Sequence, residues 1–307
     1  TLGEVEHRAL TPLPYWKIPG ANDLIPRLQD FNRDMDLLNS KLYELIDGCL
    51  EERDPQELEA LENKDYDNVK DPSMLRFLVD LRGEEVDSKQ MRDDLITLLI
   101  AGHETTAATL TWATYALIHH PEELRKLQQE IDEKVGDRRP TIEDIKQMPQ
   151  LQNALGETLR MWPAPPLLIR CALEEDTWPE GGTGIEGGVK LERASDLFIS
   201  LYNMGRSPQE RSMSHAATKA QLWEKPDNFD TSRWEKPFVN PEVKGWKGYD
   251  PSLRRGLYPS EIATDYAFLP FGAGERKCVG DQFATLEAAV ALIMLLRRHY
   301  LLHHTTT

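Results

Sequence analysis

The chain has 307 residues, of which 40% are hydrophobic and 29% are charged, a composition typical of a globular protein with a sizeable core. Its 52 acidic and 36 basic side chains give a formal net charge of -16, which would repel a phosphate backbone, so we do not expect nucleic-acid binding. The three cysteines are odd in number and far apart, which argues against a disulfide framework and paired-cysteine zinc sites and favours a reducing compartment.

The first part of the chain predicts two helices separated by an acidic connector. Apolar residues recur at helical spacing over Leu28–Leu50, and acidic residues then outnumber basic ones over Glu51–Asp67, which indicates a solvated segment. Asp87 or Ser88 can cap a second helix, which continues to Pro121. At ~1.5 Å per residue this helix is roughly 50 Å long, so we expect it to be central to its domain.

Three shorter helices are predicted next. One follows Pro121, one is capped by Thr141, and one runs from about Leu151 to Met161, where a cluster of prolines ends it. The first 20 residues lack an apolar core and a basic leader. The most apolar run, Leu95–Ile118, contains charged and hydroxyl side chains, so neither segment predicts a membrane span or a targeting peptide.

Strand content is expected to be small. The glycine-rich region Thr177–Lys190 predicts turns, and Asp196–Tyr202 predicts a short buried strand. A last helix from about Gln282 to Arg298 carries apolar residues on one face. The predicted fold class is therefore mainly α with a small β part.

A glycine-rich loop before the last helix contains a single cysteine. Phe271, Gly274, Cys278 and Gly280 follow the spacing F-x-x-G-x-x-x-C-x-G. A thiolate that ligates haem iron needs a tight turn at which glycines admit the backbone close to the macrocycle. Backbone N–H groups and the N-terminus of the following helix would stabilise the negative sulfur. The alternative is an ordinary buried free cysteine.

This loop resembles the cysteine-ligand loop of the cytochrome P450 superfamily, with Glu275 where proline is common. The resemblance implies haem b as the cofactor, bound to the protein through the Cys278 thiolate, with Phe271, Gly274 and Gly280 in the cofactor-binding loop. It also implies the cytochrome P450 fold.

A second resemblance is the segment Glu157–Arg160, in which an acid and a base are three residues apart on one helix face. Most such pairs are solvated. In the family this pair is buried and is held by an arginine from a later loop, and Phe229–Trp234 resembles that loop, although Thr231 and Ser232 replace its usual proline and glutamate. The resemblance therefore implies that Arg233 is the third member.

The third resemblance lies within the long helix, where Ala101–Thr106 is similar to the oxygen-activating segment of the family. Gly102 leaves room for dioxygen. The Thr105 hydroxyl can disturb the helix hydrogen bonds and open a pocket for water, while Glu104 can relay protons. Glu104 and Thr105 are thus the predicted catalytic residues. The alternative is a polar patch packed against a neighbouring helix.

Two arginines stand where the family often places residues that bind the haem propionates, Arg170 and Arg276. The alternative for either is a surface salt bridge. By the same resemblance, substrate is expected to contact apolar residues of the long helix and of the proline-rich segment that follows Glu157–Arg160. These residues are Leu98, Leu99, Ala101, Pro165, Pro166, Leu167 and Leu168.

Three stretches, Leu13–Pro19, Lys89–Leu95 and Pro165–Arg170, are most similar to the plastid carotenoid-ring hydroxylases of the superfamily. The resemblance implies a plastid monooxygenase that hydroxylates a lipophilic substrate with dioxygen and electrons from a ferredoxin or a reductase. Residues 1–307 are then expected to be the C-terminal part of one catalytic domain, truncated at the N-terminus, and membrane association of a full-length protein is compatible with this.

The chain departs from the family in several places. The early helix that contacts a haem propionate and the terminal β hairpin have no counterpart here, and Gly205–Lys225 is longer than the equivalent stretch, in which histidine usually stands at Gly205. Two alternative functions therefore stay open. One is a haem-thiolate hydroperoxide isomerase or lyase, against which Glu104 and Thr105 argue because that chemistry needs no proton delivery. The other is a non-catalytic fragment.

Overall fold

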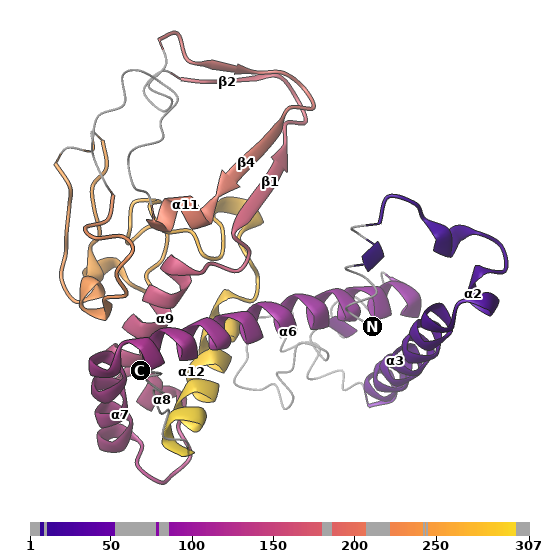
Figure 1. The fold of residues 1–307 in the computed structure, drawn as a ribbon, viewed down its shortest axis with the longest axis horizontal. Coiled ribbons are helices and arrows are strands. Elements are labelled where there is room, and N and C mark those ends of the chain that lie inside the picture. The colour runs from indigo at the N-terminus through magenta and orange to yellow at the C-terminus, as the bar shows by residue number, and fades with distance from the viewer. Residues whose placement is uncertain are drawn as a thin grey trace, which may run out of the picture. The chain divides into compact units, whose positions relative to one another are not determined.

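The computed structural model describes residues 7–8, 11–52, 78–79, 86–179, 186–206, 222–241, 243 and 245–298, which are mainly helical (Figure 1). The chain divides into two compact units, Thr1–Ala101 and Gly102–Thr307. Helix α6 (Ser88–His119) contributes to both units and confirms the predicted long helix. The expectation that residues 1–307 belong to one catalytic domain stays a prediction.

The first unit contains η1 (Tyr15–Lys17), α2 (Ala21–Leu24), α3 (Pro26–Glu51) and the start of α6. Helix α3 confirms the predicted helix, and Pro26 lies in its first turn, where the missing N–H costs nothing. Its Ile46 packs with Val79 and Met91 in a small core cluster. Leu37 and Leu45, which share the periodic pattern, are exposed. The acidic connector lies outside the described residues from position 53 onward.

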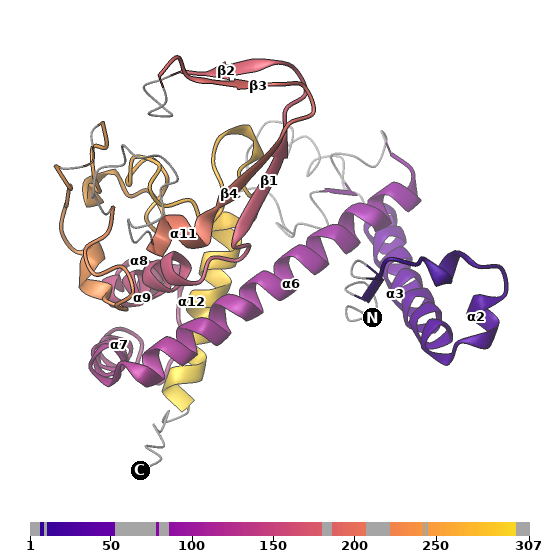
Figure 2. The ribbon, with the colours of Figure 1, turned by 45° about the horizontal axis from the view of Figure 1, so that its top comes forward.

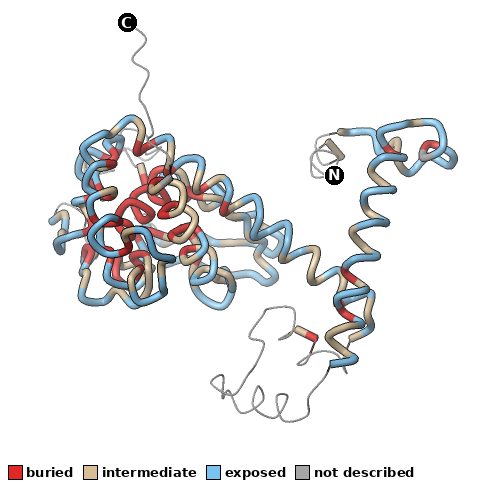
Figure 3. Tube along the Cα trace, turned by 90° about the horizontal axis from the view of Figure 1, so that it is seen from below, coloured by how far each residue is buried: buried red, intermediate tan, exposed pale blue. Residues whose placement is uncertain are grey.

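The predicted shorter helices are confirmed in the second unit as α7 (Pro121–Lys134), α8 (Ile142–Lys146) and α9 (Pro149–Met161), and the last helix as α12 (Asp281–Arg298) (Figure 2). Thr141 caps α8 in a capping box with Asp144. Apolar side chains of α6, α7, α9 and α12 form the main core cluster. Figure 3 shows that most of the buried residues lie in this unit. Among the described helices, none combines the length and the apolar composition that a membrane crossing requires.

In the part of the chain that the structure describes, four strands form two antiparallel pairs, β1 (Leu167–Cys171) with β4 (Asp196–Ser200) and β2 (Asp176–Trp178) with β3 (Val189–Leu191). The region predicted as turns thus begins and ends in strands. The predicted strand at Asp196–Tyr202 ends at Ser200 because α11 (Leu201–Arg206) starts there. Its burial was predicted wrongly: a two-stranded sheet leaves one face open, and Phe198 opposite Ile169 is exposed on that face.

The described residues between α11 and α12 are mostly irregular, with three short 3-10 helices, η3 (Thr231–Trp234), η4 (Pro251–Leu253) and η5 (Gly274–Arg276). Aromatic side chains hold this region together. The cluster comprises Leu159 of α9 with Trp223, Trp234, Tyr249, Tyr258, Ala263, Ala267 and Phe268. It connects α9 to the segment that leads into Cys278.

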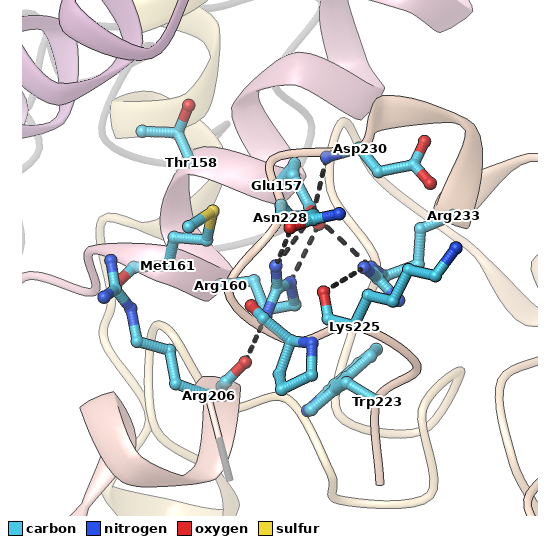
Figure 4. A network of polar contacts seen from close by, with 12 residues as sticks. Glu157, Thr158, Arg160, Met161, Arg206, Trp223, Lys225, Asn228, Asp230 and Arg233 are labelled. Atoms are coloured by element: carbon cyan, nitrogen blue, oxygen red, sulfur yellow. Dashed lines mark hydrogen bonds and ion pairs between the residues drawn. The ribbon is translucent and has the colours of Figure 1, made fainter. Parts of the chain in front are cut away.

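Helix α9 contains a buried ion pair, drawn in Figure 4. The Arg160 guanidinium donates two parallel hydrogen bonds to Glu157, Nε to Oε2 at 2.9 Å and Nη2 to Oε1 at 2.8 Å. Both side chains are 0% exposed. Arg233 of η3 adds a third contact, with its Nε 3.3 Å from Glu157 Oε1. The buried pair and the third arginine predicted from the sequence are confirmed.

Every charge of this network has neutral partners as well. Glu157 accepts hydrogen bonds from the Trp234 indole at 3.1 Å and from the Asp230 backbone N–H at 3.0 Å. Arg160 donates to three carbonyl oxygens, those of Gly205, Pro226 and Asn228, and lies 5.7 Å from the centre of the Trp223 ring. Burial of a charged pair is tolerated only when the remaining donors and acceptors are satisfied in this way.

The close approach of α11 to α9 accounts for glycine at position 205. A Cβ atom built on Gly205 would overlap the backbone carbonyl oxygen of Arg160. Because that atom belongs to the helix backbone, it cannot move aside as a flexible side chain could. A histidine, the usual residue in the family, would require a different separation of the two helices.

We predict that Glu157→Ala destabilises the protein by about 3–5 kcal/mol, because it leaves the buried Arg160 guanidinium without its counter-charge. Chemical denaturation monitored by tryptophan fluorescence measures the change. The matched control is Glu122→Ala, which removes an exposed Glu-x-x-Arg pair with Arg125 on α7 and should cost less than about 1 kcal/mol. Equal effects of the two substitutions would contradict a special role for the buried pair.

Candidate functional site

The cysteine loop leads from the aromatic cluster into α12. The Cys278 backbone N–H donates to the Phe271 carbonyl oxygen at 2.8 Å and closes the loop. Gly272 and Gly274 adopt positive φ angles of 74° and 68°, a conformation that favours glycine. Gly274 was singled out from the sequence, whereas Gly272, which the same glycine-rich run contains, was not. A Cβ on Gly280 would lie 3.9 Å from Cys278 Sγ, so glycine keeps space open beside the sulfur.

Cys278 is exposed, unlike the ordinary buried cysteine of the alternative interpretation. Two large apolar side chains that follow it in the sequence are also exposed, Val279 by 78% and Phe283 by 68%. No group of three or more His, Cys, Asp or Glu side chains among the described residues could hold a metal ion. An accessible thiol beside exposed apolar side chains, without further protein ligands, would suit haem, because the macrocycle supplies nitrogen ligands to the iron and is itself largely apolar.

A polar cluster lies behind the cysteine loop. Lys277 Nζ donates to both carboxylate oxygens of Glu261, at 3.1 and 3.0 Å, and lies 3.2 Å from Asp281 Oδ2. The Tyr258 hydroxyl donates to the same Asp281 oxygen at 2.6 Å. The Tyr258 ring packs against Phe271 with a centroid separation of 4.8 Å, so the cluster is attached to the core.

The cluster perturbs the ionisation of its members. Partial burial alone would lower the pKa of Lys277, but its contacts with Glu261 and Asp281 outweigh burial and raise it. Burial would raise the pKa of Asp281, but hydrogen bonds from Tyr258, Gln282 and Lys277 outweigh burial and lower it. Burial, followed by the hydrogen bond to Asp281, raises the pKa of Tyr258. Lys277 and Asp281 are therefore held in their charged forms and Tyr258 in its neutral form around neutral pH.

The predicted oxygen-activating segment lies on α6, which is a continuous helix across these residues. The Thr109 hydroxyl donates to the Thr105 carbonyl oxygen at 2.9 Å. Gly102, His103 and Glu104 are exposed, so within the described residues this segment is not packed against a neighbouring helix. The exposure of Glu104 therefore disfavours the alternative in which this segment is a polar patch packed against a neighbouring helix.

Sequence reasoning missed the adjacent hydroxyl. Thr106 is 7% exposed, and its Oγ1 atom has no hydrogen-bond partner in the part of the chain that the structure describes. A buried hydroxyl without a partner is costly unless water or a ligand satisfies it. The only sequence signal is its place beside Thr105, since threonines are common on helices.

The two predicted propionate-binding arginines belong to different elements. Arg276 ends η5, within the cysteine loop itself, and is exposed. Arg170 lies on β1 two residues after Leu168, so both side chains leave the same face of the strand. The Leu168 Cδ1 atom would be 3.9 Å from a Cβ built on Gly272, so this face of β1 turns toward the loop. Neither arginine forms an ion pair with a described residue, which disfavours the salt-bridge alternative.

The family model described as Cytochrome P450 matches residues 15–306. Cytochrome P450 97B2, chloroplastic, of Glycine max is 47% identical over 298 residues, which cover 97% of this chain and 50% of that protein. Protein LUTEIN DEFICIENT 5, chloroplastic, of Arabidopsis thaliana is 39% identical over 97% of this chain and 43% of its own length.

Carotene epsilon-monooxygenase, chloroplastic, of Arabidopsis thaliana is 38% identical over 297 residues, 97% of this chain and 48% of that protein. The chain thus spans about half the length of these relatives. Their names agree with the resemblance to plastid carotenoid-ring hydroxylases that the sequence predicted. With a family model matched over nearly all of its length and a single accessible cysteine in the expected loop, the chain belongs to the cytochrome P450 family.

Proposed function

We propose that the protein is a haem-thiolate monooxygenase that hydroxylates a lipophilic substrate, a carotenoid ring, in the plastid. The observation that carries the proposal is the accessible Cys278 thiol on an apolar surface at the end of the glycine-rich loop. The names of the relatives, which include a chloroplastic carotene monooxygenase, support the substrate class and the compartment.

Haem, when bound, supplies the iron centre that activates dioxygen for insertion of one oxygen atom into a C–H bond. Cys278 would hold it through the thiolate, within a loop that includes Phe271, Gly274 and Gly280. Arg276 and Arg170 would bind the propionates through charge-assisted hydrogen bonds, since neither guanidinium is engaged in an ion pair with a described residue.

On α6, the exposed Glu104 carboxyl exchanges protons with solvent, and the Thr105 hydroxyl holds a water molecule that passes them toward the oxygen-binding space. Electrons would come from a separate ferredoxin or reductase, as the resemblance to the plastid hydroxylases implies. The requirement for outside electrons separates this proposal from a hydroperoxide isomerase, and a requirement for bound haem separates it from a non-catalytic fragment.

Cys278→Ser should abolish the thiolate-type Soret band of the reduced carbon monoxide complex, because a serine oxygen does not donate charge to iron as a thiolate does. The matched control is Cys171→Ser, which changes an exposed cysteine on β1 and should leave the band unchanged. Absorbance of the reduced, haem-loaded full-length chain under carbon monoxide is the measurement. A Cys278→Ser protein that keeps the band would rule out Cys278 as the ligand.

Thr105→Ala should retain haem and substrate binding but divert reducing equivalents into hydrogen peroxide. Product formation should fall by up to about 10²-fold, the lower end of what a positioned proton-transfer group contributes. The measurement is product formed per electron consumed, with substrate binding followed by its spectral shift. Thr111→Ala, an exposed position on the same helix whose hydroxyl donates to Ala107, is the control. If Thr105→Ala forms as much product per electron as Thr111→Ala, Thr105 has no role in proton delivery and only packs within the helix.

A further inference from the structure

Lys277 is the residue immediately before the cysteine and is the centre of the polar cluster behind the loop. Its ammonium group contacts two carboxylates that come from opposite sides of the loop. Glu261 belongs to the segment that precedes the loop, and Asp281 is the first residue of α12. The Lys277 side chain therefore connects the segment before the loop to the helix after it. Lys277 is also the neighbour of Cys278 in the chain.

The two anchors of Lys277 are themselves fixed. Asp281 accepts a hydrogen bond from Tyr258, which is 2% exposed and belongs to the aromatic core cluster. The carboxylates of Glu261 and Asp281 are largely covered, whereas the Lys277 side chain is partly covered. Ion pairs at such sites are stronger than exposed ones because water screens them less. The connection that Lys277 makes is therefore attached to a rigid part of the second unit.

Backbone hydrogen bonds alone leave the end of the loop weakly held. The Cys278 N–H bonds to Phe271 and the Lys277 N–H bonds to Gly274, both within the loop itself. Among the described residues, the Lys277 ammonium and the Asp281 carboxylate connect the end of the loop to the surrounding structure through their side-chain contacts. Without Lys277, two carboxylates would face each other with no cation between them, which favours separation of Glu261 from α12.

We propose that Lys277 is a positioning residue for the haem ligand: it joins Glu261 to Asp281 and so holds the end of the loop in the conformation in which Cys278 would bind iron. The inference rests on the proposed function of Cys278. The role of Lys277 depends on its positive charge, which bridges the two carboxylates. Arginine can replace it, and an uncharged side chain of similar length cannot.

The test compares Lys277→Met with Lys277→Arg in the haem-loaded full-length chain. For Lys277→Met we expect the reduced carbon monoxide complex to lose most of its thiolate-type Soret band during an incubation over which the wild type retains it. Lys277→Arg should retain the band. The matched control is Lys146→Met, which removes a lysine of an exposed ion pair with Glu143 on α8 and should behave as the wild type.

The thermal midpoint and the haem content of each variant distinguish a general loss of stability from a specific loss of the bond between Cys278 and iron. A positioning role requires that Lys277→Met loses the thiolate band at a temperature at which it stays folded. If Lys277→Met fails to fold, Glu261→Gln removes one anchor alone and should show a smaller loss of the same kind. A band in folded Lys277→Met or in folded Glu261→Gln that persists as long as in Lys146→Met would overturn the inference. If the wild type itself lacked the band, the proposed function and not this inference would have failed.

Discussion

A carboxylate and a guanidinium buried on one turn of α9 impose conditions that much of the second unit has to meet. Glu157 and Arg160 are both fully covered, and a buried charge is costly unless a counter-charge and hydrogen bonds surround it. The partners that satisfy this pair come from segments far away in the sequence, Gly205 of α11, Pro226 and Asn228 of the following loop, and η3. The ion pair thus dictates where these irregular segments lie.

The same network leads to the candidate site. Trp234, which donates to Glu157, is a member of the aromatic cluster, and so is Tyr258, which holds Asp281 at the start of α12. The cysteine loop connects this cluster to α12, and its glycines allow the turn that brings the sulfur to the surface. A rigid polar core on one side and an open apolar surface on the other is the arrangement that a preorganised ligand site requires.

Much of this could be predicted from the sequence, because the helices of the second unit are marked by local signals. Prolines and the Thr141 cap bounded α7, α8 and α9, and the fixed spacing of the cysteine loop identified Cys278. Contacts that join distant residues carry no such signal. Trp223 beneath Arg160, Glu261 beside Lys277 and the pairing of β1 with β4 depend on how irregular segments fold back, which periodicity does not report.

The central claim is that Cys278 is the protein ligand of a haem iron, presented by a loop that the polar core holds in place. X-ray absorption at the iron edge of the haem-loaded wild-type protein tests it most directly, because it identifies the atoms bound to iron without relying on activity. We expect a sulfur atom in the first coordination shell of the iron together with the porphyrin nitrogens. A first shell of nitrogen and oxygen alone, in protein that retains its haem, would contradict it.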